Sequence, residues 1–266
     1  MAVQKQGIIF ANRSSITQLL TPYSHHSTMR FLLFLLAFIP QTVRPHSGVV
    51  LKSPELKGID VSHYQEVIEW DTVVARQRPD FVFVKCTEGS DYADSLYCQN
   101  WEALRRLGVR RGAYHFFRAY GCGDVQARHF LKTAELQVGD LVPVLDIETT
   151  SGVAPEIMIE EARVWLQIVE EQLGVKPIIY SGYRFYERYL AGHLDDYPLW
   201  IARYSNEAPA LSGGKIWNIW QYSNQGCYDG ISQKVDMNVF PGTPEMLNQL
   251  SCVRPGANCV PANTAP

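Results

Sequence analysis

The chain has 266 residues, of which 46% are hydrophobic and 19% are charged, as is usual for a folded globular protein. Its net charge of -3 and the lack of a basic run argue against a nucleic-acid-binding surface. The length allows one large domain or two small ones.

An apolar segment near the N-terminus is typical of a secretory signal peptide, which we place at residues 29–47. Arg30 provides a positive start, and the apolar run Phe31–Ile39 is too short to span a bilayer but suits a signal-peptide core. We interpret residues 1–28 as a disordered upstream extension and Met29 as the true start. We therefore expect a secreted protein, extracellular or periplasmic, that leaves the membrane after signal removal. The alternative is a folded N-terminal segment with a buried apolar strand.

The cysteine count fits that compartment, because an even number of cysteines behind a signal suggests disulfides. Cys252 and Cys259 lie close together in the tail, residues 251–266, and we expect them to pair. No C-x-x-C pair is present, which argues against a structural zinc site, and we expect neither a metal nor a cofactor. The six cysteines are Cys86, Cys98, Cys122, Cys227, Cys252 and Cys259.

From Leu56 onward, strand-like and helix-like segments alternate. The strand-like segments are Lys57–Val61, Phe81–Thr87, Gly112–Phe117, Leu141–Glu148 and Pro177–Ser181. The amphipathic segments are Ile68–Gln77, Leu96–Leu107, Asp124–Leu136, Pro155–Leu173 and Arg184–Leu190. Repeated strand–helix units predict a parallel sheet with helical crossovers.

The last three strand-like segments, Pro198–Tyr204, Lys215–Ser223 and Lys234–Val239, follow a different pattern. The links between them hold about ten residues rich in Gly, Pro, Ser and Asn, whereas parallel crossovers usually need a dozen or more residues. We expect these strands to join antiparallel or through irregular loops. The whole pattern predicts an α/β fold, a single TIM-like barrel over residues 56–250, with its chemistry at the carboxyl ends of the parallel strands.

The segment LVPVLDIETT contains the most informative pair of residues. Leu141–Ile147 is apolar on both faces apart from Asp146, as in a strand buried on both sides. Alternation places Val142, Val144, Asp146 and Glu148 on one face, so the two carboxylates lie about 6–7 Å apart. In a buried pair, one acid holds a proton near neutral pH because the other holds a charge. An ordinary exposed D-x-E and a site for a hard cation are the alternatives.

Other polar and aromatic side chains fall at the predicted strand ends. They are Asp60, Lys85, Thr87, Glu88, Tyr114, Phe116, Tyr180 and Asp236. Because the strand ends share one rim, we expect these side chains to meet near the D-x-E pair. Acids placed at random would fall mostly on helix faces and loops, so this convergence is a stronger signal than the pair alone.

At these residues the chain resembles the glycoside hydrolase family 25 lysozymes, the Chalaropsis-type N-acetylmuramidases. The resemblance runs from Gly58 to Phe240 through the motifs GIDVSHYQ, FVFVKCTEG, GAYHFF, PVLDIE, PIIYSGY, PLWIARY, WQYS and GISQKVDMNVF. It implies a flattened (β/α)5β3 barrel and cleavage of the β-1,4 bond between N-acetylmuramic acid and N-acetylglucosamine in peptidoglycan. Cys86 departs from the family, which more often has a small residue there.

The resemblance also implies roles for the acids. Glu148 is the expected general acid, with Asp146 charged beside the developing oxocarbenium ion or the substrate's acetamido group. Asp60 and Asp236 are expected to position the sugar, polarise the acetamido group or hold the acid pair. The D-x-E spacing does not decide between two-carboxylate and substrate-assisted mechanisms.

Aromatic and amide side chains near the rim are candidate sugar contacts, namely Tyr114, Tyr180, Trp200 and Gln221, with barrel filling as the alternative for each. Glu88 joins the substrate-binding candidates, but a structural role is equally open. If Lys85 and Thr87 face the barrel interior, Glu88 faces away from it.

Three other kinds of protein compete with the lysozyme interpretation. A phosphodiesterase-type barrel would use the acids to hold a divalent metal, but the sequence shows no His-rich ligand set for it. A chitinase-like glycosidase would carry a further Asp two residues before the D-x-E pair, where this chain has Val144. A non-catalytic cell-wall-binding protein would tolerate loss of the acid, and Glu148 is present. We expect bacterial peptidoglycan as the partner and a monomeric protein.

Overall fold

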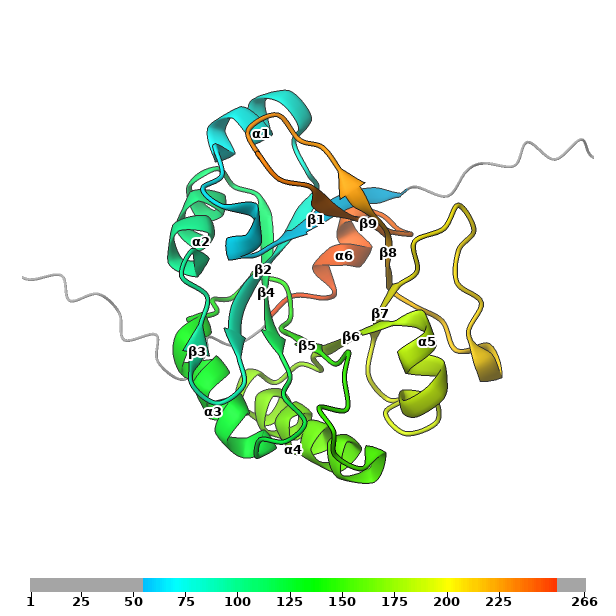
Figure 1. The fold of residues 1–266 in the computed structure, drawn as a ribbon. Coiled ribbons are helices and arrows are strands. Elements are labelled where there is room, and N and C mark those ends of the chain that lie inside the picture. Colours follow the sequence, from blue (N-terminus) through cyan, green and yellow to red (C-terminus); the bar gives the residue numbers. More distant parts are fainter. Residues whose placement is uncertain (1–54, 253–266) are drawn as a thin grey trace, which may run out of the picture. The chain divides into compact units, whose positions relative to one another are not determined.

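A computed structural model describes residues 55–252 of the chain (Figure 1). The predicted upstream extension and signal peptide lie outside the described residues, as does the tail beyond Cys252. No helix in the described part combines the length and apolar character needed to cross a membrane.

The described residues form nine strands in one sheet. They are β1 (Leu56–Val61), β2 (Phe81–Glu88), β3 (Tyr92–Ala93), β4 (Arg110–Phe116), β5 (Val144–Asp146), β6 (Ile178–Gly182), β7 (Leu199–Ala202), β8 (Ile219–Gly226) and β9 (Val235–Phe240). The order β1-β9-β8-β7-β6-β5-β4-β2-β3, together with a β1–β2 pairing, closes eight of them into a barrel. β3 is attached outside the ring as a short antiparallel partner of β2. The predicted α/β barrel is therefore confirmed.

The strand directions agree with the prediction that the last three strands join antiparallel or through irregular loops. Within the closed ring, all neighbours from β1 through β2 to β8 are parallel, and β9 alone runs antiparallel, to both β8 and β1. The β7–β8 link is irregular, as expected, with one 3-10 turn at Ser212–Gly214. The predicted strand start at Lys215 is wrong, because β8 begins at Ile219. The longer link is what lets β8 return parallel to β7 without an α-helix.

Most of the helices cover the outside of the barrel, whereas the last one, Pro244–Asn248, buries Leu247 in the apolar cluster inside it. The helices are α1 (Trp70–Gln77), α2 (Tyr97–Arg106), α3 (Gly123–Ala134), α4 (Pro155–Leu173), α5 (Tyr183–Phe185) and α6 (Pro244–Asn248). The predicted helix Arg184–Leu190 is instead α5 followed by a π-helical turn, Tyr186–Leu190. The longest helix, α4, begins with a proline at its first turn and ends at Gly174 in the left-handed conformation.

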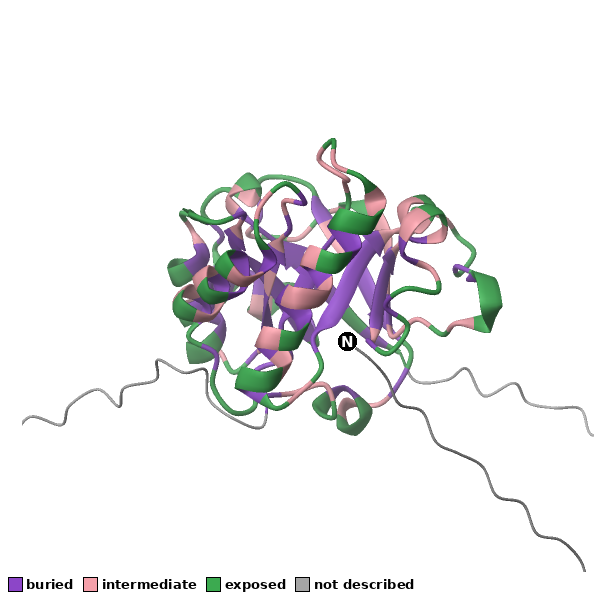
Figure 2. Cartoon of the chain, turned by 90° about the horizontal axis from the view of Figure 1, so that it is seen from below, coloured by how far each residue is buried: buried purple, intermediate pink, exposed green. Residues whose placement is uncertain are grey.

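The apolar residues form two separate clusters, one between barrel and helices and one inside the barrel. Figure 2 shows the buried strands surrounded by helices whose outer faces are exposed. Phe81 and Phe83 fill the interior beside glycines: a Cβ atom on Gly58 would lie 2.2 Å from the Phe81 ring, and one on Gly112 would lie 2.3 Å from the Phe83 ring. This aromatic filling leaves room for a pocket only toward the carboxyl ends of the strands.

The central strand β5 is shorter than the predicted Leu141–Glu148. Pro143 has no N–H to donate to a neighbouring strand, and Leu141 forms an isolated bridge with Ser251 instead. The predicted alternation holds, with Val144 in the inner cluster and Leu145 in the outer one. Glu148 follows two residues after the end of the strand.

The five cysteines of the described residues are all free thiols. Cys252 is buried, and its Sγ lies 3.7 Å from the carbonyl oxygen of Leu141. Its predicted partner, Cys259, lies outside the described residues. The structure therefore gives no support to the predicted disulfide.

Candidate active site

A cavity of about 230 Å³ opens at the carboxyl ends of the parallel strands. Its lining residues are Asp60, Tyr64, Lys85, Glu88, Tyr114, Phe116, Arg118, Val144, Asp146, Glu148, Tyr180, Trp200 and Asp236. All four acids predicted to be catalytic meet here. Of the five predicted substrate contacts, only Gln221 does not line the pocket.

The D-x-E pair combines a buried acid with an accessible one. Asp146 is only 5% exposed, and its Oδ1 has no hydrogen-bond partner among the described residues. Glu148 is exposed. Burial, followed by repulsion from Glu148, raises the pKa of Asp146 well above its usual value. Desolvation within the pocket raises the pKa of Glu148 as well, while the charge of Lys85 lowers the pKa of both acids.

This pair therefore shares a proton at a pH where isolated carboxyls would be charged. Asp146 is the more deeply buried of the two side chains, and the shared proton belongs to the pair rather than to either residue. Sequence spacing places two acids on one face but does not give their relative depth.

The second pair of acids, Asp60 and Asp236, lies directly across the β1–β9 ladder. Because β9 is antiparallel, a residue near its start reaches the rim where β1 ends. Burial, followed by repulsion from Asp236, raises the pKa of Asp60 to about 8. Burial, followed by repulsion from Glu148, raises the pKa of Asp236 to about 6.

Two amides hold Asp60 in place. The side-chain nitrogens of Gln221 and Asn238 donate to the same oxygen, Oδ2 of Asp60, at 3.0 and 2.7 Å. Oε1 of Gln221 accepts from the hydroxyls of Tyr180, at 2.9 Å, and Tyr204, at 3.1 Å. The prediction that Gln221 contacts sugar is therefore wrong, because the side chain is 1% exposed and both ends of its amide are occupied.

Trp200 is also mainly structural. It is 2% exposed, donates from Nε1 to Oδ1 of Asn238 at 2.9 Å, and packs its ring 4.9 Å from the ring of Phe83. Sequence reasoning missed Asn238, although it lies two residues after Asp236 and so faces the same side of β9. It also missed Tyr204, although alternation along the predicted strand Pro198–Tyr204 places it on the same face as Trp200.

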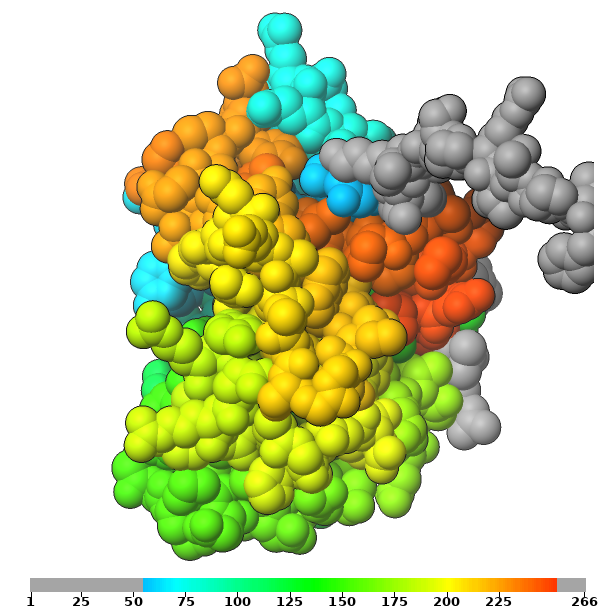
Figure 3. Space-filling view, turned by 90° about the vertical axis from the view of Figure 1, so that its right-hand side faces the viewer, coloured from blue at the N-terminus to red at the C-terminus, as the bar shows by residue number. Residues whose placement is uncertain are grey.

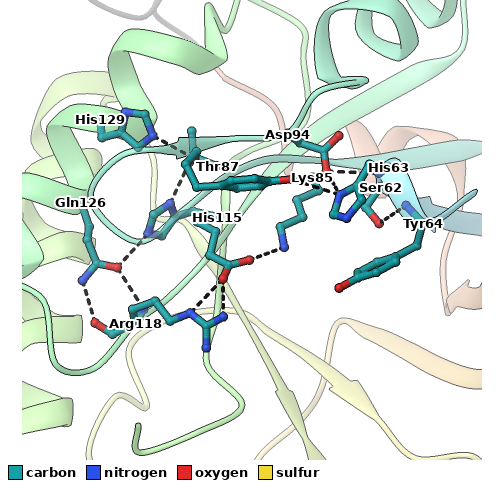
Figure 4. Close-up of polar contacts among 12 residues, drawn as sticks. Ser62, His63, Tyr64, Lys85, Thr87, Asp94, His115, Arg118, Gln126 and His129 are labelled. Carbon is teal, nitrogen blue, oxygen red and sulfur yellow. Dashed lines mark hydrogen bonds and ion pairs between the residues drawn. The ribbon is translucent and has the colours of Figure 1, made fainter. Parts of the chain in front are cut away.

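An ion cluster occupies the wall opposite these amides. Nζ of Lys85 lies 2.6 Å from Oε2 of Glu88, and Arg118 donates to Oε1 of Glu88 from Nε, at 2.9 Å, and from its terminal nitrogen (Figure 4). Desolvation raises the pKa of Glu88, but the hydrogen bonds from Lys85 and Arg118 outweigh it, and the net shift is downward. Glu88 therefore stays charged and is not a proton donor.

The predicted orientation of β2 is wrong at Thr87. The β2–β4 register shifts between Lys85 and Thr87, so both Cys86 and Thr87 turn outward and Glu88 faces the pocket. Oγ1 of Thr87 lies 2.7 Å from Nδ1 of His115 in the buried layer behind the strands.

Side chains outside the pocket hold the neighbouring loop residues in place through hydrogen bonds. Gln126 accepts from the backbone N–H of Arg118 at 3.0 Å and donates to its carbonyl oxygen at 2.9 Å. On the other side, Asp94 accepts from the backbone N–H of His63 and lies 2.7 Å from its ring, which holds the turn carrying Tyr64 (Figure 4). Within residues 55–252, no group of three or more His, Cys, Asp or Glu side chains is arranged to hold a metal ion.

The family model and the similar proteins of known family agree with one another. A model of the family described as glycosyl hydrolases family 25 matches residues 59–231. The uncharacterized protein YegX of Escherichia coli strain K12 is 40% identical over 211 residues, which cover 77% of each chain. Lysozyme M1 of Streptomyces globisporus is 30% identical over 74% of this chain and 71% of that protein. The solved structure of a family 25 glycosyl hydrolase from Bacillus anthracis is 31% identical, with a TM-score of 0.68, over 73% of this chain and 92% of that chain.

Proposed function

This chain belongs to glycosyl hydrolase family 25, and on that basis we propose that it is a lysozyme acting on peptidoglycan. The bond it cleaves is the β-1,4 bond between N-acetylmuramic acid and N-acetylglucosamine. The observation that carries the proposal is the acid pair in the pocket, a buried Asp146 beside an accessible Glu148, both with raised pKa values. The name of the relative from Streptomyces globisporus, a lysozyme, agrees with it.

Glu148 is the residue that can reach the glycosidic oxygen, because it is exposed at the pocket while Asp146 is not. A bound sugar covers Glu148 and desolvates it further, which favours the protonated form. Glu148 then donates its proton to the leaving oxygen as the bond breaks. Asp146 takes up the negative charge of the pair and stabilises the positive charge that develops on the sugar ring.

Asp146 also offers an oxygen with no protein partner. A buried acceptor without a partner is costly, so Oδ1 of Asp146 is suited to an N–H donor from the substrate. The acetamido group of the sugar supplies such a donor. Asp60 and Asp236 complete the acidic surroundings, with Asp60 held toward the pocket by its two amide partners.

Reducing-end analysis of digested peptidoglycan tests the proposed bond directly. We expect new reducing ends on N-acetylmuramic acid, no cleavage of chitin oligomers, and unchanged rates in EDTA. New ends on N-acetylglucosamine would indicate a different glycosidase, and binding without any new ends would indicate a cell-wall-binding protein. Restoration of an EDTA-inhibited reaction by a divalent ion would instead show that the acids bind metal.

We also propose that the protein is secreted, on the basis of the apolar segment within residues 29–47. The mature chain is expected to begin between Val43 and Lys52. N-terminal sequencing of protein recovered from the medium or periplasm checks this, and secreted protein that still begins at Met1 would contradict it.

A further inference from the structure

A second hollow lies beyond the ends of β6 and β7. It has a volume of about 690 Å³ and is lined by residues 182–185 and 202–205. Two residues earlier on the same strands, Tyr180 and Trp200 line the acidic pocket. The two hollows therefore share one edge of the barrel. Figure 3 views the side of the molecule where the segments after β6 and β7, yellow-green to yellow, form much of the surface.

Tyr204 connects the two hollows. Its hydroxyl donates to Gln221, the amide that holds Asp60, and its side chain lines the second hollow with the residue 55% exposed. Burial, followed by the charges of Asp236 and Asp60, raises the pKa of Tyr204. Tyr204 therefore links the lining of the second hollow to the amide that holds Asp60.

The second hollow is cationic, in contrast to the acidic pocket. Arg184 and Arg203 line it, and no acid does. The guanidinium of Arg203 lies over the ring of Tyr183, 5.2 Å from its centroid, which fixes its plane. Its side chain makes one long hydrogen bond, 3.4 Å, to the carbonyl oxygen of Ala208. Most of the five N–H donors of this guanidinium therefore remain available to a ligand.

Neither arginine is committed to an acid of the protein. In the part of the chain that the structure describes, the arginines that form ion pairs do not include Arg184 or Arg203. They are Arg105, Arg106, Arg111, Arg118, Arg128 and Arg163. Two unpaired guanidinium groups facing one hollow repel each other unless an anion lies between them. The planar donor fork of arginine matches the paired oxygens of a carboxylate or a phosphate.

We propose that this second hollow binds a free carboxylate of the peptide that N-acetylmuramic acid carries next to the cleaved bond. The inference rests on the proposed function, since it takes the sugar in the acidic pocket to be part of peptidoglycan. The peptide leaves the sugar through the lactyl group, and its carboxylates are repelled by the acids of the first pocket. The neighbouring hollow offers opposite charge, a volume within the usual range for ligand sites, and the apolar rings of Tyr183 and Phe185 for the peptide's aliphatic atoms.

Binding measurements on an inactive background test this independently of catalysis. The probe is a set of soluble, uncrosslinked glycan strands free of wall phosphate, with their peptide carboxylates either intact or converted to neutral amides. For the Glu148→Gln protein, we expect amidation to raise the Kd about three- to tenfold, the lower range for a charge-assisted contact in a solvent-exposed site. Adding Arg203→Gln should raise the Kd for intact strands by a similar factor and leave the Kd for amidated strands unchanged.

Three further variants sharpen the result. Arg184→Gln replaces an exposed side chain and should act in the same direction as Arg203→Gln. Arg203→Lys keeps the charge but loses the donor fork, so it should restore part of the affinity. Arg188→Gln is the matched control, because Arg188 is exposed on the same helical segment but does not line the hollow.

The inference is overturned if amidation leaves the Kd unchanged, or if the arginine variants weaken binding of intact and amidated strands equally. It is also overturned if the arginines matter only for strands that retain wall phosphate. Failure of the proposed function has a different signature, namely that the wild-type protein releases no reducing ends from the intact strands.

Discussion

At the scale of single residues, depth separates the two acids of the D-x-E segment. Asp146 and Glu148 point to the same side of the chain, but only Glu148 lies where a substrate oxygen can reach it. Asp146 can influence the reaction through its charge and its unpaired oxygen, whereas Glu148 can transfer a proton. The two substitutions at these positions should therefore have different effects.

Glu148→Gln keeps the shape of the side chain and removes the transferable proton. General acid catalysis contributes about 10²–10⁴-fold, so we expect turnover to fall by at least that factor while binding of glycan strands survives. Release of reducing ends measures the rate, and thermal unfolding verifies the fold. Glu171→Gln, on the exposed side of α4, is the matched control and should leave turnover unchanged. Near wild-type turnover in folded Glu148→Gln protein would remove Glu148 from its assigned role.

Lys85→Gln tests the electrostatics of the pair. The charge of Lys85 lowers the pKa values of both Asp146 and Glu148, so its loss should raise both. The alkaline limb of the pH–rate profile reports deprotonation of the coupled pair and should move to higher pH. Glu88 keeps Arg118 as its partner in this variant. Lys132→Gln, exposed on α3, should leave the limb in place, and a shift of the Lys85→Gln limb to lower pH would contradict the assignment.

Residue positions were predictable from the sequence where strand alternation and a shared rim decide them, as for Asp60, Asp146 and Asp236. Alternation failed at Thr87, because one irregular position in β2 changes the face of every side chain after it and brings Glu88 to the pocket. It also failed for Gln221, since alternation gives the face of a strand but not the depth at which a side chain lies.

At the scale of elements, the positions of the barrel strands were predictable because apolar runs and helical periods mark them clearly. β3 was missed because a two-residue strand carries no periodicity. The helix predicted at Arg184–Leu190 carries a helical apolar pattern, and nothing in that pattern distinguishes the π-helical turn that forms there.

Glycines inside the barrel allow the aromatic filling that defines the floor of the pocket. In Gly112→Ala, the new methyl group would lie 2.3 Å from a ring atom of Phe83 and 3.1 Å from Cβ of Leu141. We expect a loss of about 1–3 kcal/mol in the free energy of unfolding, as for other overpacked cores. This corresponds to a drop in Tm of about 2–4 °C per kcal/mol.

The control for this change is Gly182→Ala, where no heavy atom lies within 4 Å of the new methyl group. Thermal unfolding should show a smaller loss for that variant, because alanine at this N-cap position meets no clash and is disfavoured only by its poorer capping. Equal losses in the two variants would show that the packing around Phe83 is not the cause.

At the scale of the whole molecule, the barrel brings four acids to one rim and raises the pKa of each. A carboxyl whose pKa is higher in the folded than in the unfolded state binds its proton more tightly when folded. Its contribution to stability is therefore complete at low pH and is lost as pH rises through the folded pKa. The acidic site should lower global stability at neutral and alkaline pH, a cost that function imposes on the fold.

Asp60→Asn isolates this effect, because both amide donors bond to the single oxygen Oδ2, which an asparagine oxygen can replace. The pKa of Asp60 rises from 3.8 to about 8, so wild-type protein loses stability up to about pH 8, and the neutral asparagine does not. Burial also lowers the pKa of His115 to about 3, which acts in the opposite direction but only below the usual histidine pKa of about 6.5. The stabilities of the two proteins are therefore best compared between about pH 6.5 and 8.5, above the range in which His115 affects stability.

In this window, we expect the Tm of wild-type protein to fall relative to that of Asp60→Asn, with a difference of a few degrees at the upper end. Asp229→Asn, which replaces an exposed carboxylate, should follow the wild-type curve. The same Asp60→Asn protein should hydrolyse peptidoglycan more slowly, because the pocket loses a charge near the developing oxocarbenium ion. Parallel Tm curves for wild type and Asp60→Asn would show that the carboxyl at position 60 does not carry a raised pKa in the folded protein. Greater stability together with lower activity is the combination expected if the acids are held at the rim for catalysis.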